Sequence, residues 1–172
     1  MENPSASWKL IIWDIVKTAG VAVLLFVGFS YFVTRVAVNG PSMHPTLKDG
    51  ESLLVWKTHG RIPPHGSIVV AENIDEGSRD LVKRLIGLPG DTISTVEDQV
   101  FVNGHLLDEP YAHGARSATT ETWKVPSDSV FLMGDNRTAS IDSRDWGFLP
   151  SDNLVGVVFF RYNPLAAFGL VR

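Results

Sequence analysis

The 172-residue sequence contains no cysteine, which excludes disulfide bonds, zinc sites built on thiolates and a cysteine nucleophile. It also lacks a basic patch of the kind that binds phosphate backbones, and its formal net charge is only −4. We therefore expect no nucleic-acid partner. The five histidines show no HExxH or other metal-binding spacing. The sequence thus predicts that the chain holds no metal and no cofactor.

One long apolar run is present, LIIWDIVKTAGVAVLLFVGFSYFV, from Leu10 to Val33. As a helix it would be about 36 Å long, enough to cross a hydrocarbon core of ~30 Å. Its two charged residues, Asp14 and Lys17, lie near its N-terminal end, where a lysine can snorkel toward the headgroups. Trp8 stands at that border, as interfacial aromatic residues do.

Three interpretations of this run compete. A cleaved signal peptide would be shorter and would be followed by a small-x-small cleavage site, which is not evident here. A buried core helix would seldom be so uniformly apolar. A retained membrane anchor fits best. The lysines and arginines on the two sides of the run are nearly equal in number, so charge alone does not set its orientation.

The sequence after the run predicts β structure, and we expect residues 1–34 to form a short N-terminus with the anchor and residues 35–172 a β-rich domain. Asn103-Gly104 predicts the tight turn of a hairpin over residues 99–109. The small, polar segment 111–122 predicts a mobile loop. Further strands are expected where branched residues cluster between Gly, Pro and Asp, at 52–56, 67–71, 81–86, 91–96, 130–133 and 154–162.

A serine follows the anchor in the stretch NGPSMHPTLKDG, residues 39–50. Pro41 and Pro45 each fix φ on either side of Ser42, so this loop is too constrained to be a simple connection. A serine hydroxyl is a weak nucleophile until a base removes its proton. No histidine offers itself convincingly as that base: His44, for example, is only two residues from Ser42.

A lysine is the other candidate base, and burial in apolar surroundings favours its neutral amine. In the strand LVKRLIG, alternation places Lys83 on one face and Arg84 on the other. Both faces are apolar, so one of the two cations must point inward or into a cleft. Alternation by itself favours the plainer interpretation of two snorkelling cations on an edge strand.

A third polar cluster, GDNRTASIDSR, spans Gly134 to Arg144. Asp135-Asn136 suits a turn after the preceding strand. The cluster is either a polar loop held by an Asp–Arg pair or a set of groups that orient a catalytic side chain.

PSMHPTL, LVKRLIGLPGD and GDNRTASIDSR occur in this order behind a membrane anchor. Together they resemble the type I signal peptidases, membrane-bound Ser/Lys proteases that remove signal peptides from exported proteins. The resemblance covers essentially the whole chain and implies a mainly β fold: an N-terminal transmembrane helix followed by a β-rich catalytic domain. The segment between Asp91 and Gly134 is short, as in the compact, Gram-positive-like members.

The resemblance implies that Ser42 is the nucleophile and Lys83 its general base. Ser140 would hydrogen-bond Lys83, and Asp142 and Arg144 would pair beneath the site. The Ser42 backbone N–H would form part of the oxyanion hole. Where one branch of the family places a second serine donor, this chain has Gly40, so a second donor must come from backbone or water, or be absent.

The substrate is expected to bind as an extended strand along the segments that lead into the two catalytic residues. Apolar Met43, Leu81 and Leu85 would floor shallow pockets that admit only small side chains, in keeping with the A-x-A-like sites that the family cuts. The expected substrate-binding residues are Val38, Asn39, Gly40, Pro41, Met43, Asp80, Leu81 and Val82.

The partners implied by the resemblance are exported preproteins with signal peptides, together with membrane lipid. The implied location is the cell membrane, with a single span, a cytoplasmic N-terminus and an extracytoplasmic catalytic domain. Two rival functions compete with this one. A cytoplasmic self-cleaving Ser/Lys repressor would need a DNA-binding helix-turn-helix where the anchor stands. An anchored, catalytically silent β scaffold would not need Ser42 and Lys83.

Overall fold

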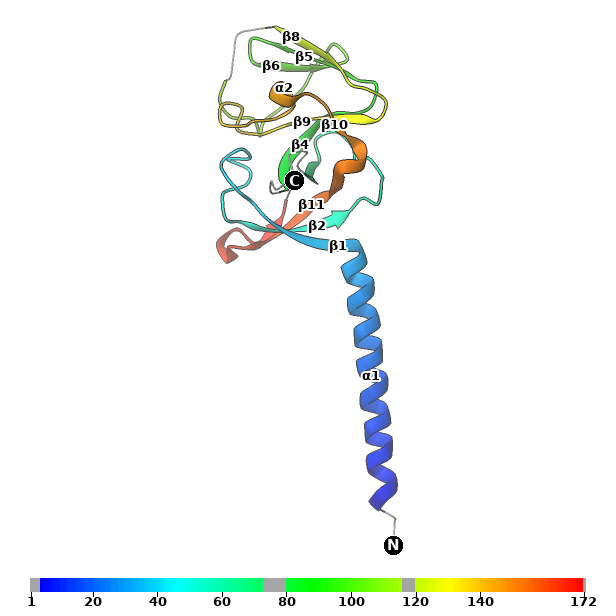
Figure 1. Ribbon diagram of the computed structural model, residues 1–172. Coiled ribbons are helices and arrows are strands. Elements are labelled where there is room, and N and C mark those ends of the chain that lie inside the picture. The colour runs from blue at the N-terminus through cyan, green and yellow to red at the C-terminus, as the bar shows by residue number, and fades with distance from the viewer. Residues whose placement is uncertain (1–3, 73–79, 116–119, 172) are drawn as a thin grey trace. The chain divides into compact units, whose positions relative to one another are not determined.

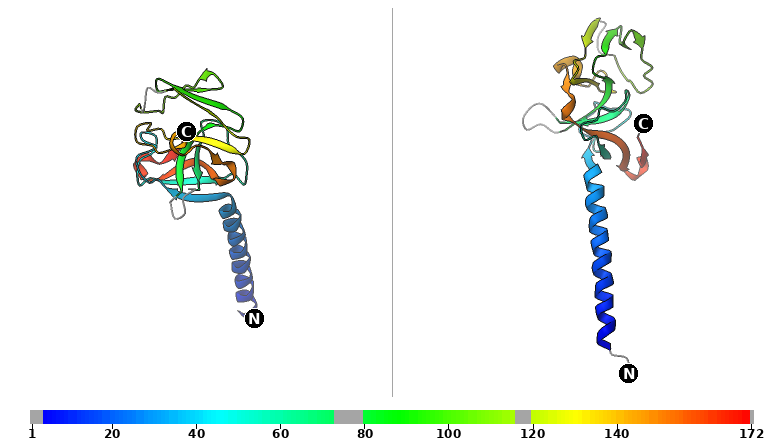
Figure 2. Two further views of the ribbon diagram at one scale, coloured as in Figure 1. Left: turned by 45° about the horizontal axis from the view of Figure 1, so that its top comes forward. Right: turned by 90° about the vertical axis from the view of Figure 1, so that its right-hand side faces the viewer.

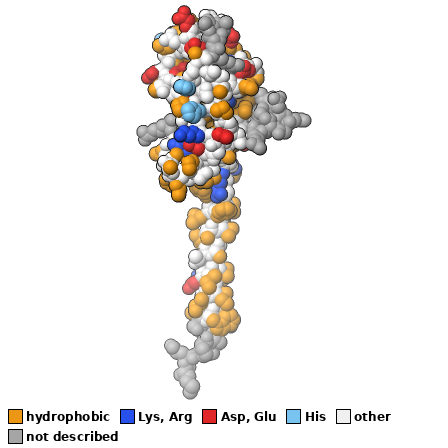
Figure 3. Space-filling view, turned by 90° about the vertical axis from the view of Figure 1, so that its left-hand side faces the viewer, with side chains coloured by type: hydrophobic (Ala, Val, Ile, Leu, Met, Phe, Trp, Pro, Cys, Tyr) orange, Lys and Arg blue, Asp and Glu red, His pale blue; other side chains and the backbone are white. Residues whose placement is uncertain are grey.

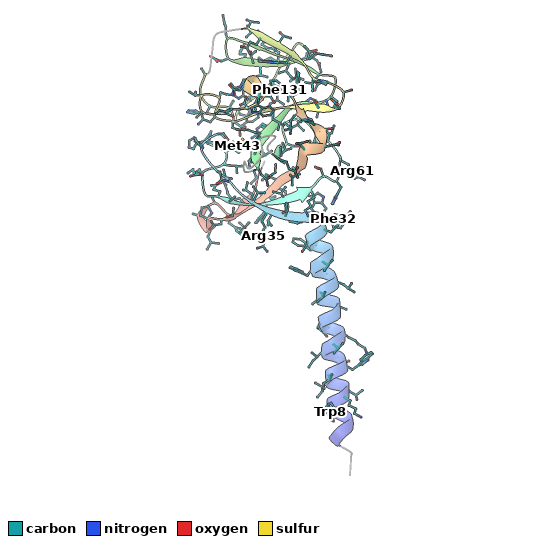
Figure 4. All side chains as sticks on the ribbon, in the orientation of Figure 1. Trp8, Phe32, Arg35, Met43, Arg61 and Phe131 are labelled. Carbon is teal, nitrogen blue, oxygen red and sulfur yellow. The ribbon has the colours of Figure 1, made fainter. Side chains whose placement is uncertain are left out.

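The computed structural model describes residues 4–72, 80–115 and 120–171 and divides into two compact units, residues 1–34 and residues 35–172 (Figure 1). The first unit is a single helix, α1 (Pro4–Phe32). From Trp8 to Phe32, the ends marked in Figure 4, it is long and apolar enough to cross a membrane. Its apolar side chains are exposed along its length, as Figure 3 shows, which fits a helix whose surroundings are lipid.

The second unit is built from two antiparallel β-sheets (Figure 2). The larger sheet has the strand order β1-β2-β11-β3-β4-β9-β10, with β12 paired to β11. Its strands are β1 (Val33–Ala37), β2 (Ser52–Lys57), β3 (Ile68–Ala71), β4 (Leu81–Gly87), β9 (Ser129–Met133), β10 (Leu149–Pro150), β11 (Leu154–Asn163) and β12 (Gly169–Leu170).

The smaller sheet has the order β7-β6-β5-β8. Its strands are β5 (Thr92–Val96), β6 (Gln99–Val102), β7 (His105–Leu106) and β8 (Glu121–Lys124). Asn103 and Gly104 have φ angles of 53° and 80° in the β6–β7 turn, which confirms the hairpin expected from that dipeptide. Short helical turns complete the unit: α2 (Ser143–Trp146), η1 (Ser151–Asn153) and η2 (Leu165–Ala167).

Three buried clusters form the core of this unit. One contains Met43 and Val82, a second contains Leu85 and Leu132, and a third contains Phe131. The third joins side chains of both sheets: Ile86, Phe131 and Met133 from the larger, and Ile93 and Val100 from the smaller. Met43 and Phe131 are marked in Figure 4. Strand β4, which carries Lys83, and strand β9, which leads into the third polar motif, pair with each other, and each sends side chains into both the second and the third cluster.

The mainly β fold is confirmed, and the strands expected outside the hairpin are present with their ends shifted by no more than one residue. The hairpin expected over 99–109 ends earlier, at Leu106. The predicted loop over 111–122 is wrong at its end, because β8 begins at Glu121. Residues 116–119 of that loop lie outside the described residues. The strands β1, β8, β10 and β12 carry too little alternation for the sequence to indicate them. The apolar run also ends one residue early as a helix, since Val33 begins β1.

Candidate active site

Ser42 lies in a tight loop between β1 and β2. The ends of the loop are closed by bonds from the Val38 N–H to the Glu51 carbonyl, 2.8 Å, and from the Gly50 N–H to the Val38 carbonyl, 3.0 Å. The Gly40 N–H donates to an Asp49 carboxylate oxygen at 2.7 Å. Beyond Ser42, the chain turns and buries Met43 and Leu47 in the core. Ser42 itself is half-buried, so the loop presents it at the surface on a fixed backbone.

The backbone of this loop is held against the segment that follows β9. The Asn136 N–H donates to the Ser42 carbonyl at 2.9 Å, and the Asn136 side-chain amide donates to the Pro41 carbonyl at 3.2 Å. Gly134 allows this approach. A Cβ at Gly134 would lie 2.5 Å from both the Ser42 carbonyl oxygen and the Ser140 Cβ, closer than real side-chain atoms come. Ser42 and Ser140 therefore flank the same glycine.

Lys83 lies in β4, between β3 and β9, with only 4% of its surface exposed. Its Nζ donates to the Ser140 Oγ at 3.0 Å. Burial lowers the pKa of Lys83 from its ordinary 10.5 to about 8, because an ammonium ion loses hydration there; the charge of Asp142 opposes this shift and that of Arg144 adds to it. An appreciable fraction of the neutral amine is therefore present near pH 8, and a neutral amine can accept a proton.

Asp142 and Arg144 lie next to Ser140. Arg144 donates from Nε and from its terminal nitrogen to the two Asp142 oxygens, each at 2.8 Å. Asp142 also accepts the Gly134 N–H at 2.9 Å and a hydrogen bond from the Ser140 side chain, and it caps α2. Burial raises the pKa of Asp142, but the bonds and charge of Arg144 outweigh burial and leave that pKa below its ordinary value. The carboxylate thus stays ionised.

Hydrogen bonds connect Lys83 to Ser140, Ser140 to Asp142 and Asp142 to Arg144, and Gly134 lets Ser140 approach the Ser42 carbonyl. Among the described residues, no hydrogen bond joins the Ser42 and Lys83 side chains. The interpretation of Lys83 and Arg84 as snorkelling cations on an edge strand is wrong, because both are buried and β4 has a strand on each side. Within the described residues, each buried polar side-chain atom has a hydrogen-bond partner. The two cations leave opposite faces of β4 and enter two different polar clusters.

The cluster around Arg84 was missed in the sequence. Its guanidinium donates to both oxygens of the fully buried Asp135, at 2.8 and 2.7 Å, and the Thr46 hydroxyl donates to the same carboxylate at 2.5 Å. The Tyr111 ring covers the guanidinium at 3.7 Å. Thr46 belongs to the Ser42 loop, so this ion pair ties that loop to β4. The sequence offered one signal for this cluster. Arg84 and Asp135 carry opposite charges and stand in two of the three polar motifs, far apart in the chain.

A second ion pair borders the first. Arg137 donates to both carboxylate oxygens of Glu109, at 2.9 and 2.6 Å, and the Tyr111 hydroxyl donates to Glu109 at 3.0 Å. Burial lowers the pKa of Arg137, but the bonds and charge of Glu109 outweigh burial and raise that pKa. The segment after β7 is therefore fastened over the Arg84–Asp135 pair, which shields the pair from water.

The two segments expected to bind substrate differ in whether their backbone has an open strand edge. The first three residues of β4, from Leu81, pair with β3, whereas β9 begins to pair only at Arg84, so one edge there carries no strand among the described residues. Val38, Gly40 and Pro41 form hydrogen bonds within the Ser42 loop and to Asn136. The remaining expected residues, Asn39 and Asp80, are exposed.

The three residues expected to form the pocket floor differ in depth and in the cluster that they join. Leu85 is fully buried in the cluster of Leu132, not in the cluster of Met43 and Val82. Met43 is also fully buried and lies beneath the surface. Only Leu81 of the three predicted floor residues is partly exposed. The reason is that β4 packs on both faces, so side chains along this strand enter different clusters: Val82 joins that of Met43, and Leu85 joins that of Leu132.

Comparison with known proteins gives a consistent result. Residues 12–163 match the family described as "Signal peptidase, peptidase S26". A probable signal peptidase I-2 of Synechocystis is 36% identical, over 98% of this chain and 79% of its own length. Signal peptidase IB of Staphylococcus aureus is 36% identical over 93% of each chain. A crystal structure of a signal peptidase I from Enterococcus faecalis aligns with 56% of this chain and 97% of its own at 29% identity and a TM-score of 0.49. The chain described here belongs to the signal peptidase family, peptidase S26.

Proposed function

We propose that Ser42 and Lys83 form the catalytic dyad with which this type I signal peptidase, a serine endopeptidase, cleaves signal peptides from exported preproteins. The observation that carries the proposal is the buried Lys83, whose pKa is about 8 and whose amine touches Ser140 beside the Ser42 backbone. A lysine that titrates near neutrality can act as a base, which an exposed lysine cannot.

In the proposed reaction, the neutral Lys83 amine takes the Ser42 proton as the hydroxyl oxygen attacks the scissile carbonyl. The Ser42 N–H, which makes no hydrogen bond among the described residues, donates to the developing oxyanion. The Lys83 ammonium then gives its proton to the departing amine. Water, deprotonated by Lys83, hydrolyses the acyl-enzyme and restores Ser42.

Ser140, Asp142 and Arg144 serve as positioning residues in this proposal. The Ser140 hydroxyl accepts from Lys83 and holds the amine at the end of a flexible side chain in one place. Asp142 fixes Ser140, and the bidentate bond from Arg144 fixes Asp142. An Asp142 carboxylate in direct contact with Lys83 would keep the amine protonated, whereas the Ser140 hydroxyl separates the two.

The substrate segment ahead of the cut binds in this proposal as an added strand on the open edge of β4, from Asp80 to Val82. Alternate side chains then face the surface above the cluster of Met43 and Val82. Because that cluster is already filled, a large residue at P1 would overpack it, at a cost of ~1–3 kcal/mol. Small residues at P1 and P3 follow from this lack of space.

α1 anchors the enzyme in the cell membrane in this proposal, with the N-terminus cytoplasmic and the β domain outside. A single apolar helix of suitable length supports the anchor. Ser42 follows the end of α1 at Phe32 by only ten residues. That short connection keeps the nucleophile near the membrane surface, where the cleavage site of an inserted signal peptide emerges, and raises the effective concentration of that site.

The test is cleavage of a purified preprotein whose P1 residue is Ala, Phe or Leu, with the cut mapped by mass spectrometry of the mature product. We expect cleavage after Ala and a rate reduced by roughly tenfold to over a hundredfold with Phe or Leu. Changes at P2 should matter little. Equal rates for P1 Ala and P1 Phe would contradict the proposed pocket.

A further inference from the structure

Two histidines that the proposed mechanism does not use lie side by side near Ser42. The ring centroids of His44 and His113 are 6.4 Å apart, and both side chains are exposed. Figure 3 shows histidine side chains gathered on one face of the β domain. Within the described residues, neither imidazole has a hydrogen-bond partner. We propose that His44 and His113 form a two-ligand site for a divalent transition-metal ion such as Zn²⁺, and that the bound ion inhibits cleavage.

The separation of the two rings fits a shared ion. Zinc binds an imidazole nitrogen at about 2.0–2.1 Å, and that nitrogen is about 1.1 Å from its ring centroid, so the ion lies about 3.2 Å from each centroid. Two imidazoles on one ion therefore have centroids at most about 6.4 Å apart, when the N–metal–N angle is linear, so the separation of His44 and His113 lies at the upper limit for a shared ion. A tetrahedral N–metal–N angle requires the two exposed side chains to rotate and bring their rings closer together.

The backbones that carry the two histidines are already fixed. The His113 N–H donates to the Asp135 carbonyl at 2.7 Å, and the Arg137 N–H donates to the His113 carbonyl at 2.8 Å. Asn136, the residue between Asp135 and Arg137, donates hydrogen bonds to the Ser42 loop. The His44 N–H donates to Pro41 in that loop at 3.0 Å. Binding of an ion therefore costs only the rotational freedom of the two side chains. Two ligands on a fixed backbone bind an ion more tightly than two ligands on a mobile one.

Two protein ligands leave room for water. Among the described residues, no cluster of three or more His, Cys, Asp or Glu side chains is present that could hold an ion alone. Waters would complete the tetrahedron, as at open zinc sites, and the ion would remain exchangeable. Imidazole suits Zn²⁺, Cu²⁺ and Ni²⁺ and disfavours Mg²⁺ and Ca²⁺, which prefer oxygen ligands. We therefore expect inhibition by the first group only.

Inhibition follows from the position of His44, two residues beyond Ser42. An ion bound to His44 and His113 ties the Ser42 loop to the segment of His113 and places two positive charges and their waters beside the nucleophile. This part of the inference rests on the proposed role of Ser42, whereas binding of the ion does not.

The experiment uses the full chain, purified without a histidine tag and held in detergent micelles. Zn²⁺ binding is measured by isothermal titration calorimetry, and preprotein cleavage is measured at the same pH over a range of Zn²⁺ and Mg²⁺ concentrations. The variants are His44→Ala, His113→Ala and the matched control His105→Ala, whose exposed side chain lies in the β6–β7 hairpin. All three should cleave at the wild-type rate when a chelator is present.

We expect one Zn²⁺ per chain and inhibition by Zn²⁺ but not by Mg²⁺. His44→Ala and His113→Ala should each weaken both effects by about tenfold or more, since even indirect ligand changes cost about 10–100-fold in affinity, and His105→Ala should change neither. Zn²⁺ binding that survives His113→Ala, or no binding at all, would overturn the site. Binding that depends on both histidines without slowing cleavage would overturn the inhibition. An enzyme inactive even with chelator would instead contradict the proposed function, because the calorimetric result does not depend on cleavage.

Discussion

The Lys83 amine donates a 3.0 Å hydrogen bond to the Ser140 hydroxyl, and within the described residues no carboxylate lies within 4.0 Å of that amine. Lys83 thus loses its hydration without gaining an ion pair. Asp142 is linked to it only through Ser140, which keeps the opposing charge one group away. This arrangement explains how burial can lower the pKa of Lys83 while a buried carboxylate lies nearby.

The pH dependence of cleavage should follow Lys83. The base must be neutral, so kcat/KM should rise about tenfold per pH unit below its pKa of about 8 and level off above it. The measurement is the initial rate of preprotein cleavage between acidic and alkaline pH. An acidic optimum with loss of activity above neutrality would point to a carboxylate mechanism.

Removing the buried charge should stabilise the protein. The folded pKa of Lys83 is about 8 and the ordinary value is 10.5, so below pH 8 the folded state holds an ammonium that it disfavours. Between these two pKa values the unfolded chain binds more protons at Lys83 than the folded chain does, so the free energy of unfolding rises with pH in that window. Below a pH of about 8, the full cost of burying the ammonium is present. Lys83→Met should therefore abolish cleavage yet raise the unfolding free energy at pH 7 by about 3 kcal/mol.

Thermal unfolding of the full chain in detergent measures this effect, with Lys48→Met as the control. Lys48 is exposed, so its replacement should leave stability nearly unchanged. A Lys83→Met protein less stable than wild type at pH 7 would show that Lys83 is a structural cation and not a destabilised base.

Ser140→Ala should lower kcat with little change in KM, because Ser140 positions Lys83 and does not touch the substrate. We expect kcat to fall by about 10–100-fold. This is less than the loss of about 10²–10⁴-fold expected when the general base itself is removed. The Ser140 hydroxyl also stabilises the Lys83 ammonium by accepting its hydrogen bond. Loss of that bond should lower the pKa of Lys83 and move the midpoint of the pH profile to lower pH. Ser143→Ala is the matched control. The Ser143 hydroxyl accepts the Leu132 N–H, so its loss should reduce stability and leave that midpoint in place.

Gly134→Ala should separate the Ser42 loop from the Ser140 loop. The new Cβ would meet the Ser42 carbonyl and Ser140 Cβ at 2.5 Å, so one of the two segments must move. We expect a loss of about 1–3 kcal/mol in stability and a strong loss of cleavage. The same change at Gly20, which has open space around it, is the control for activity and fold. Wild-type activity in Gly134→Ala would exclude a close-packed arrangement of the two loops.

Much of the fold could be predicted from the sequence because its signals are local. The apolar run, the Asn103-Gly104 turn and the branched-residue strands each depend on neighbouring residues, and the structure confirms them. The order of the strands could not be predicted in this way, since β11 lies between β2 and β3 and pairs with segments far away in the chain. Such pairing is settled by tertiary packing.

The candidate site shows the same limit. Alternation along β4 placed Lys83 and Arg84 on opposite faces, but it could not show that both are buried, because that depends on β9 and on the partners Ser140 and Asp135. The resemblance to a family, not periodicity, suggested the role of Ser140. The cover that Tyr111 forms over Arg84 had no local signal at all.

The central claim, that Ser42 and Lys83 act as one catalytic unit, is tested most directly by preprotein cleavage with Ser42→Ala, Lys83→Ala and the double variant. Each single variant should lose essentially all activity while keeping a wild-type circular dichroism spectrum. The double variant should be little worse than either, because residues that act in one step are not additive. Substantial cleavage by Lys83→Ala, or single losses that multiply in the double variant, would contradict the dyad.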